Sequence, residues 1–205
     1  MSISIKLIES DLQFEKLAKK ALAKEINKEG RSAARVIQSK IKPVITSALA
    51  ASPEMASVSG GVLALEFGLE SDPSSSIIAG IVDSLSVSWT PVKPSNFSGG
   101  IEIRMQPTDF SNILSLPAAS QRIDGGSLPW LEWLLTRGDS IIITGFGVEF
   151  GSFPDTRTGG ARMSSSFGPY KVNSAFSGNI DDNFITRAVA RVRSQITNII
   201  KGALK

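Results

Sequence analysis

The stretch that decides the fold covers residues 10–52 and reads SDLQFEKLAKKALAKEINKEGRSAARVIQSKIKPVITSALAAS. Ser10 and Gln13 have the spacing of a capping box, which predicts a helix that begins directly after Ser10. Apolar residues then recur at the spacing of one helix face. They are Phe14, Leu17, Ala18, Ala21, Leu22, Ile26, Ala33, Ala34, Val36, Ile37, Ile41, Val44 and Ile45. The pattern predicts one long helix or two collinear ones that end before Pro53, with a kink or a division at Pro43.

A stripe of basic residues follows the same segment at spacings of four and three. It consists of Lys16, Lys20, Lys24, Lys28, Arg31 and Arg35. Glu15, Glu25 and Glu29 interleave with it, and the stripe offers no aromatic side chain on which a base could stack. We therefore interpret the stripe as a solvated face. Gly30 weakens the helix, because glycine is a poor helix former.

A second amphipathic helix is predicted at residues 182–203. Asp181 and Asp182 place negative charge where the start of a helix favours it, and Lys201 and Lys205 place positive charge at its end. The apolar face consists of Phe184, Ile185, Ala188, Val189, Val192, Ile196, Ile199, Ile200 and Ala203. Both helices need a surface on which to bury their apolar faces.

Alternating residues between the two helices predict short strands. Residues 85–90 and 101–104 form an expected antiparallel pair, and one or two further strands follow Asp139. Shorter helices are expected at about 73–82, 108–116 and 129–137. The fold class predicted is α+β, with one domain over residues 1–205 and both long helices packed on a small mixed or antiparallel sheet.

Residues 151–180 are rich in Gly, Ser, Pro and Asn and show little periodicity. We expect a long irregular arm that protrudes, is mobile in the isolated subunit and becomes ordered on a neighbour, with strand-like or turn-mediated main-chain contacts. Its aromatic and basic residues are the candidate interface: Phe153, Arg157, Arg162, Phe167, Tyr170 and Phe176.

The composition excludes much familiar enzyme chemistry. The 205 residues include no cysteine and no histidine, so disulfides, cysteine nucleophiles, imidazole bases and the usual zinc sites are absent. A carboxylate-only hydrolase or a hard-cation oxygen site remains open. No apolar run is long enough to span a membrane and the N-terminus does not resemble a signal peptide, so we expect a protein made and used inside a cell.

Charge is distributed in blocks along the chain. Residues 1–45 hold 10 basic and 5 acidic side chains, residues 46–180 hold 7 and 12, and residues 181–205 hold 5 and 2. The basic ends of one copy can attract the acidic middle of another copy or of a partner. The alternative is that two solvated helices are simply rich in lysine.

Three short motifs have simpler structural explanations. Residues 137–140 spell RGDS, but Gly138 stands where a helix should end and a strand follows. Residues 158–162, TGGAR, lack the Gly-Lys-Ser/Thr of a nucleotide loop and are better explained as a turn that presents two arginines to a partner. Glu132 lies between two tryptophans, as a general acid could, but a solvent-exposed or salt-bridged residue on a short helix is the better explanation.

Three blocks in this order resemble a family of virion structural proteins of contractile-tailed bacteriophages, associated with the neck or tail-completion region. They are LPWLEWLL with Gly138 and Asp139 (128–139), TRTG through Met163 (156–163), and DNFITRA (182–188). The family usually carries WRVPPEFAG before the last block. The matching YKVNSAFSG (170–178) keeps the aromatic residue, the cation, Val, Phe and Gly but lacks both prolines.

The resemblance implies a virion subunit assembled in the host cytoplasm. Its partners would be copies of itself in a ring and neighbouring neck or tail proteins. It implies no enzymatic activity, catalytic residue, cofactor or metal, no specific nucleic-acid recognition and no membrane. The alternatives are a carboxylate-dependent cell-wall glycosidase, a baseplate component and a small nucleic-acid-binding protein. A glycosidase requires two acids across a cleft, and a nucleic-acid binder requires more than a net charge of +3 or interleaved aromatics.

Overall fold

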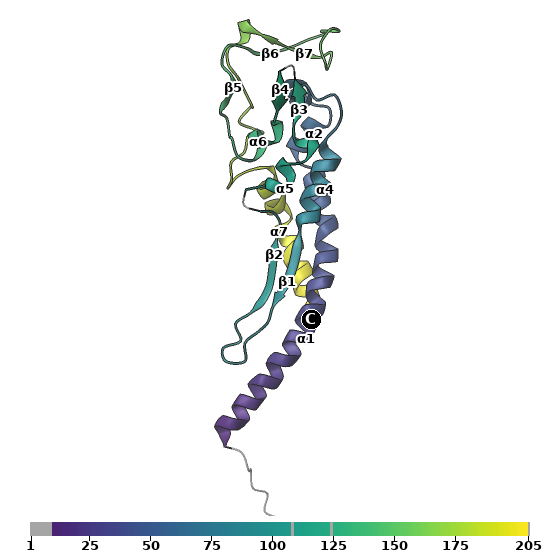
Figure 1. Cartoon of the computed structure of the whole chain (residues 1–205). Helices are drawn as coiled ribbons and strands as arrows, with labels where there is room; N and C mark the ends of the chain where they lie inside the picture. The colour runs from purple at the N-terminus through teal and green to yellow at the C-terminus, as the bar shows by residue number, and fades with distance from the viewer. Residues whose placement is uncertain (1–9, 108, 124, 205) are drawn as a thin grey trace, which may run out of the picture.

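The longest helix of the molecule is α1, Asp11–Ala50, which runs along its whole length (Figure 1). The computed structural model describes residues 10–107, 109–123 and 125–204. Ser10 caps α1 through the predicted capping box with Gln13. Pro43 lies inside the helix and does not divide it, because Ile41 and Ile45 on either side of it are buried in the same core. The prediction of one long helix is confirmed.

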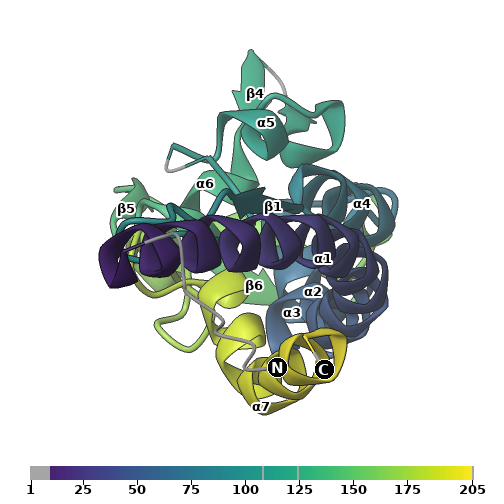
Figure 2. The ribbon, with the colours of Figure 1, turned by 90° about the horizontal axis from the view of Figure 1, so that it is seen from below.

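The C-terminal helix α7, Phe184–Ala203, packs beside α1 (Figure 2). The side chain of Asn183 caps it by accepting hydrogen bonds from the backbone N–H groups of Ile185 and Thr186. Asp181 and Asp182, predicted at the start of this helix, thus directly precede its N-cap residue. A partly buried ion pair ties the start of α7 to α2, Pro53–Val58. Arg187 Nη2 lies 2.6 Å from Oε1 of Glu54, whose side chain is 3% exposed.

The predicted antiparallel pair is confirmed as β1, Ser86–Thr90, and β2, Gly100–Arg104. This hairpin lies along α1, and Asn27 fixes it there. Trp89 Nε1 and the backbone N–H of Val92 donate hydrogen bonds to Asn27 Oδ1 at 2.9 and 2.6 Å, and Asn27 Nδ2 donates to the Val92 carbonyl. One amide side chain therefore sets the position of the hairpin on the helix.

Short helices complete the wider end of the molecule. They are α3 (Val62–Phe67), α4 (Ser74–Ser84), α5 (Ser111–Leu114), α6 (Trp130–Leu135) and the 3₁₀ turn η1 (Pro117–Ala119). The three predicted short helices correspond to α4, α5 and α6. Large fully buried side chains from several elements join in one core, including Ile37, Leu49, Phe67, Ile77, Trp130 and Phe184.

The remaining strands form three more antiparallel pairs. These are β3 (Gln121–Ile123) with β4 (Gly126–Leu128), β5 (Ile141–Ile143) with β8 (Tyr170–Lys171), and β6 (Gly147–Phe150) with β7 (Ala161–Ser164). The α+β class is confirmed. In place of the single sheet expected, the described residues form four two-stranded sheets.

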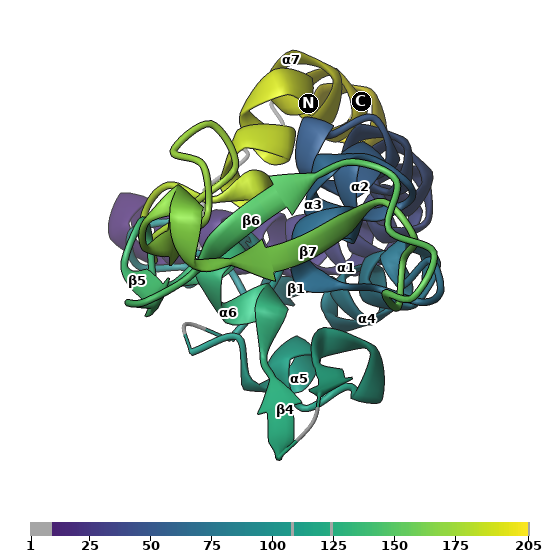
Figure 3. The same ribbon diagram turned by 90° about the horizontal axis from the view of Figure 1, so that it is seen from above.

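The segment 151–180 differs from the irregular arm expected. It contains β7, η2 (Ser165–Phe167) and β8, and both strands pair with strands of the same chain. The β6–β7 ribbon crosses the end of the molecule (Figure 3). Backbone bonds continue it, from Gly151 N–H to the Gly160 carbonyl and from Phe153 N–H to the Gly159 carbonyl. Main-chain contacts expected with a neighbour are thus made within the chain.

Gly30 is a poor helix former, but the packing of α1 against the β1–β2 hairpin requires a glycine at this position. A Cβ at this position would overlap the Trp89 ring. We expect Gly30→Ala to lower the free energy of unfolding by about 1–3 kcal/mol, although alanine is the better helix former, because the ring is held by Asn27 and must move. Urea denaturation measures the change. Ser32→Ala, an exposed change on the same helix, is the control. A more stable Gly30→Ala variant would contradict the packing argument.

Candidate interaction site

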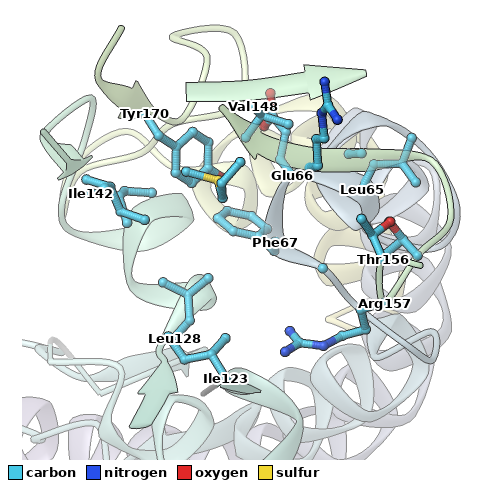
Figure 4. Close-up of a pocket in the computed structure, with 16 residues that line it drawn as sticks. Leu65, Glu66, Phe67, Ile123, Leu128, Ile142, Val148, Thr156, Arg157 and Tyr170 are labelled. Carbon is cyan, nitrogen blue, oxygen red and sulfur yellow. The ribbon is translucent and has the colours of Figure 1, made fainter. Parts of the chain in front are cut away.

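A cavity of about 500 Å³ lies beneath the β6–β7 ribbon (Figure 4). Its walls come from α3, the β3–β4 hairpin, β5, β8 and the ribbon itself, so it is formed by segments far apart in the sequence. Its apolar lining includes Leu65, Phe67, Leu128, Ile142, Val148 and Met163. The arrangement is that of a small apolar binding pocket with few polar groups.

Glu66 of α3 supplies the carboxyl group of the cavity. Its Oε2 atom is buried and has no hydrogen-bond partner in the described part of the chain. Burial raises the pKa of Glu66 to about 7 from an ordinary value of 4.5, because an apolar environment disfavours the charged form. The cavity therefore contains a carboxyl group that changes its protonation state near neutral pH.

Tyr170 of β8 lies on the same side of the cavity as Glu66 in Figure 4. The residue is 5% exposed, and its hydroxyl oxygen has no hydrogen-bond partner among residues 10–107, 109–123 and 125–204. Burial and the nearby Glu66 charge raise the pKa of the Tyr170 phenol well above its ordinary range. Buried polar groups are rarely left unpaired, so these two atoms are available to hydrogen-bond a water molecule or another group that enters the cavity.

Two of the predicted interface arginines line the cavity, and both are paired within the chain. Arg157 Nε lies 3.3 Å from Glu70 Oε1, and Arg162 Nε lies 2.7 Å from Glu149 Oε2. The Arg162 guanidinium also lies 4.4 Å from the centre of the Phe153 ring. The acidic partners expected on a neighbour are thus supplied by the same chain.

The other predicted interface residues are divided between two places. Phe167 in η2 is exposed on the outer end of the molecule. Phe176 is partly buried against the main core. The structure therefore brings Arg157, Arg162 and Tyr170 to the cavity, with Phe153 stacked behind Arg162.

The three short motifs have structural roles. Glu132 accepts a hydrogen bond from Arg137 Nε at 2.9 Å, so the salt bridge considered for it is confirmed. Gly138 of RGDS has φ +63° and donates its N–H to the Gly178 carbonyl, which makes this motif a turn. In TGGAR, a Cβ at Gly160 would lie 2.9 Å from the Leu65 side chain, so the glycine allows the loop to pack on α3.

Sequence reasoning did not single out Glu66. The signal available was its position as the only acid in an otherwise apolar run, VLALEFGL (62–69). Periodicity cannot show that the chain returns about a hundred residues later to place Tyr170 beside it. The cavity is a product of tertiary structure.

The cavity lining limits the chemistry that this site can perform. Glu66 is the only acidic residue among the described residues that line it. Within the described ranges, no cluster of three or more Asp or Glu side chains could hold a metal ion. Among the same residues, no helix has the length and apolar character needed to cross a membrane.

Two of the blocks that carry the phage-family resemblance meet around α6 and the start of α7. Trp130 is fully buried and donates Nε1–H to the Ala118 carbonyl at 3.0 Å. Gly178 donates its N–H to the Trp133 carbonyl, and a Cβ there would overlap the Leu134 carbonyl and approach Asn183. The block 156–163 lies at the cavity instead.

Comparisons with known proteins identify no relative of this chain. No protein-family model, no curated protein and no solved structure matches this chain.

The raised pKa of Glu66 predicts how stability depends on pH. The folded chain retains the Glu66 proton between pH 4.5 and about 7, where the unfolded chain releases it, so this contribution to stability is lost progressively over that range and is gone above it. We expect Glu66→Gln to be more stable than the wild type at pH 8.5 by about 1–2 kcal/mol, after allowance for partial exposure, and by clearly less at pH 5.5.

Urea denaturation at the two pH values tests this expectation. The chain contains no histidine or cysteine, so few other groups titrate in this window. Glu29→Gln is the matched control, because the Glu29 side chain is 71% exposed on α1. A Glu66→Gln variant whose stability follows the wild type at both pH values would disprove the effect.

Proposed function

We propose that this chain is a structural subunit of a tailed-phage virion that forms an oligomeric ring or connector at the neck or tail through protein contacts. The molecule is elongated (Figure 1). The observation that carries the proposal is that exposed apolar side chains gather on the elements at its two ends. The resemblance of residues 128–139, 156–163 and 182–188 to phage neck proteins gives the class of particle.

The first apolar end is the N-terminal part of α1, which extends beyond the body of the molecule (Figure 1). Leu12, Phe14, Leu17 and Leu22 are between 52% and 78% exposed there. Isolated exposed apolar residues are ordinary, but four within three turns of one projecting helix favour a protein contact.

The second apolar end surrounds the cavity and the β6–β7 ribbon. Its exposed members are Ile141, Ile143, Phe146, Phe150, Met163 and Phe167. A stable protein interface buries roughly 800 Å² on each partner, and aromatic residues and methionine are enriched in such interfaces. This end has the residue types that such a contact requires.

The charge blocks support contacts between copies. Residues 11–45 of the basic N-terminal block lie on α1, and the acidic block of residues 46–180 includes the cavity end. Opposite charges on two surfaces steer subunits together and fix their orientation. We propose that the chain acts as one domain in the virion and is assembled in the host cytoplasm. Its other partners would be neighbouring neck or tail proteins.

The raised pKa of Glu66 is the one observation that favours a glycosidase, because a general acid must hold its proton near neutral pH. Glycoside hydrolysis also needs a second carboxyl across the site, and the described lining of the cavity offers Glu66 alone. The assembly role is therefore the better-supported proposal. A place in the baseplate is the alternative within the particle.

Proteomics of purified particles, combined with imaging, tests the proposed function. We expect the chain in several copies per particle and its labelled form in a ring at the neck or tail. Purified chain should release no sugars from cell walls, and Glu132→Gln, which alters a surface salt bridge, should leave assembly near normal. Absence from purified particles, or wall hydrolysis lost in Glu66→Gln or Glu132→Gln, would contradict the proposal.

A further inference from the structure

We propose that the cavity beneath the β6–β7 ribbon receives the N-terminal turns of α1 from a second copy of this chain. The inference rests on the proposed function and deepens it by naming the two surfaces through which copies join.

The inserted surface is a stripe on α1 made of Phe14, Leu17, Ala18 and Ala21, called here the α1 stripe. All four residues are exposed. Their spacing of i, i+3, i+4 and i+7 is that of a helix that lays anchor residues into an apolar groove. The hairpin residues Trp89 and Val92 meet α1 further along, at Asn27, so they do not cover the stripe.

The occupant of the cavity must come from another molecule. An α-helix rises about 1.5 Å per residue, which places Leu17 about 50 Å from the end of α1 near the cavity. Figure 1 shows the N-terminal turns of α1 and the β6–β7 ribbon at opposite ends of the molecule. A chain with a continuous α1 therefore cannot fill its own cavity with its own α1 stripe.

The receiving surface suits apolar side chains. Ile123, Ile143 and Met163 line the cavity and are each about 40% exposed, so they form an apolar rim that leads into an apolar interior. Sugars and nucleotides require many polar partners, whereas this rim offers few. A phenyl and an isobutyl group from one helix face match the apolar lining and fit within the volume of about 500 Å³.

Charge complementarity favours a copy of this chain over an arbitrary apolar partner. Lys20 and Lys24 stand three and seven residues after Leu17, on one edge of the α1 stripe, and the described residues place no carboxylate in an ion pair with either. Inside the cavity, Glu66 Oε2 has no hydrogen-bond partner among the described residues. A lysine can bury its aliphatic stem and present its ammonium group to such a carboxyl.

The other charged groups at the cavity do not compete for Glu66. Arg157 and Arg162 are paired with Glu70 and Glu149, and Tyr170 is neutral near pH 7 because burial raises its pKa. Glu66 is therefore the carboxyl left for a cation from outside.

A contact between two different surfaces repeats in one direction. Each copy that inserts its stripe keeps a free cavity for the next, so the arrangement closes into a ring or continues as a filament. This is the symmetry that a ring subunit requires, and it makes a sharp prediction for mixtures of variants.

The test uses three variants of the full chain, followed by size-exclusion chromatography with light scattering. Phe14→Ser combined with Leu17→Ser removes the stripe, and Met163→Lys places a positive charge on the cavity rim against the incoming lysines. All three positions are exposed, so circular dichroism should show an unchanged fold. Ile180→Ser, an exposed apolar residue outside both surfaces, is the matched control.

We expect the wild type and Ile180→Ser to self-associate with rising concentration, and each surface variant alone to remain a monomer. An equimolar mixture of the stripe variant and Met163→Lys should form a heterodimer that grows no further, because one intact stripe meets one intact cavity. A photo-crosslinking residue at position 17 should label the cavity of another copy, at or near residues 143 and 163.

Any of four results would overturn the proposal: a wild type that stays monomeric at its solubility limit, surface variants that associate normally, a mixture that remains monomeric or assembles fully, or loss of association in Ile180→Ser. The assay uses purified chain, whereas the virion role is tested on particles. The inference can therefore fail while the proposed function stands, and the reverse also holds.

Discussion

The packing of α7 against α1 is the constraint on which the rest of the structure depends. α1 has 40 residues and α7 has 20, so the shorter helix can cover only part of the apolar face of the longer one. The Arg187–Glu54 pair fixes where α7 starts, beside α2. Arg187 also holds Asp182 in place, because its Nη1 atom lies 3.0 Å from Asp182 Oδ1. Removing Arg187 would leave the charge of the buried Glu54 carboxylate uncompensated, so the position of this helix start is strongly held.

The length difference determines what remains exposed. The β1–β2 hairpin covers part of α1 through Asn27. Its loop also comes near the first turns of α1, where Pro94 and Ser95 line a hollow with Leu12 and Lys16, but Phe14 and Leu17 remain exposed. An amphipathic helix that projects in this way loses the burial that stabilises most protein helices. Its apolar residues are easier to understand as one half of an interface than as part of a finished monomer.

The cavity at the other end shows the complementary arrangement. Glu66 is placed in an apolar environment at a cost in stability, and Tyr170 is buried without a hydrogen-bond partner in the described residues. Chains depart from well-satisfied cores mainly where function requires it. Arg157 and Arg162, which the sequence analysis expected to pair with acidic groups of a neighbour, instead form ion pairs with Glu70 and Glu149 of the same chain. The interface that we propose at this end would therefore depend on apolar shape and on one carboxyl more than on the arginines.

The sequence by itself determined the elements whose signals are local. The capping pattern at Ser10 and the apolar period located α1, and alternation located the β1–β2 hairpin, because each signal depends on residues a few positions apart. What only the tertiary structure decided depends on contacts between distant segments. The strand pairing of residues 161–171, the fit of Trp89 on Gly30 and the meeting of Glu66 with Tyr170 join residues 11 to 104 positions apart. Glycine-rich segments such as 151–160 show no periodicity of their own, so their structure is set by the strand or core on which they pack.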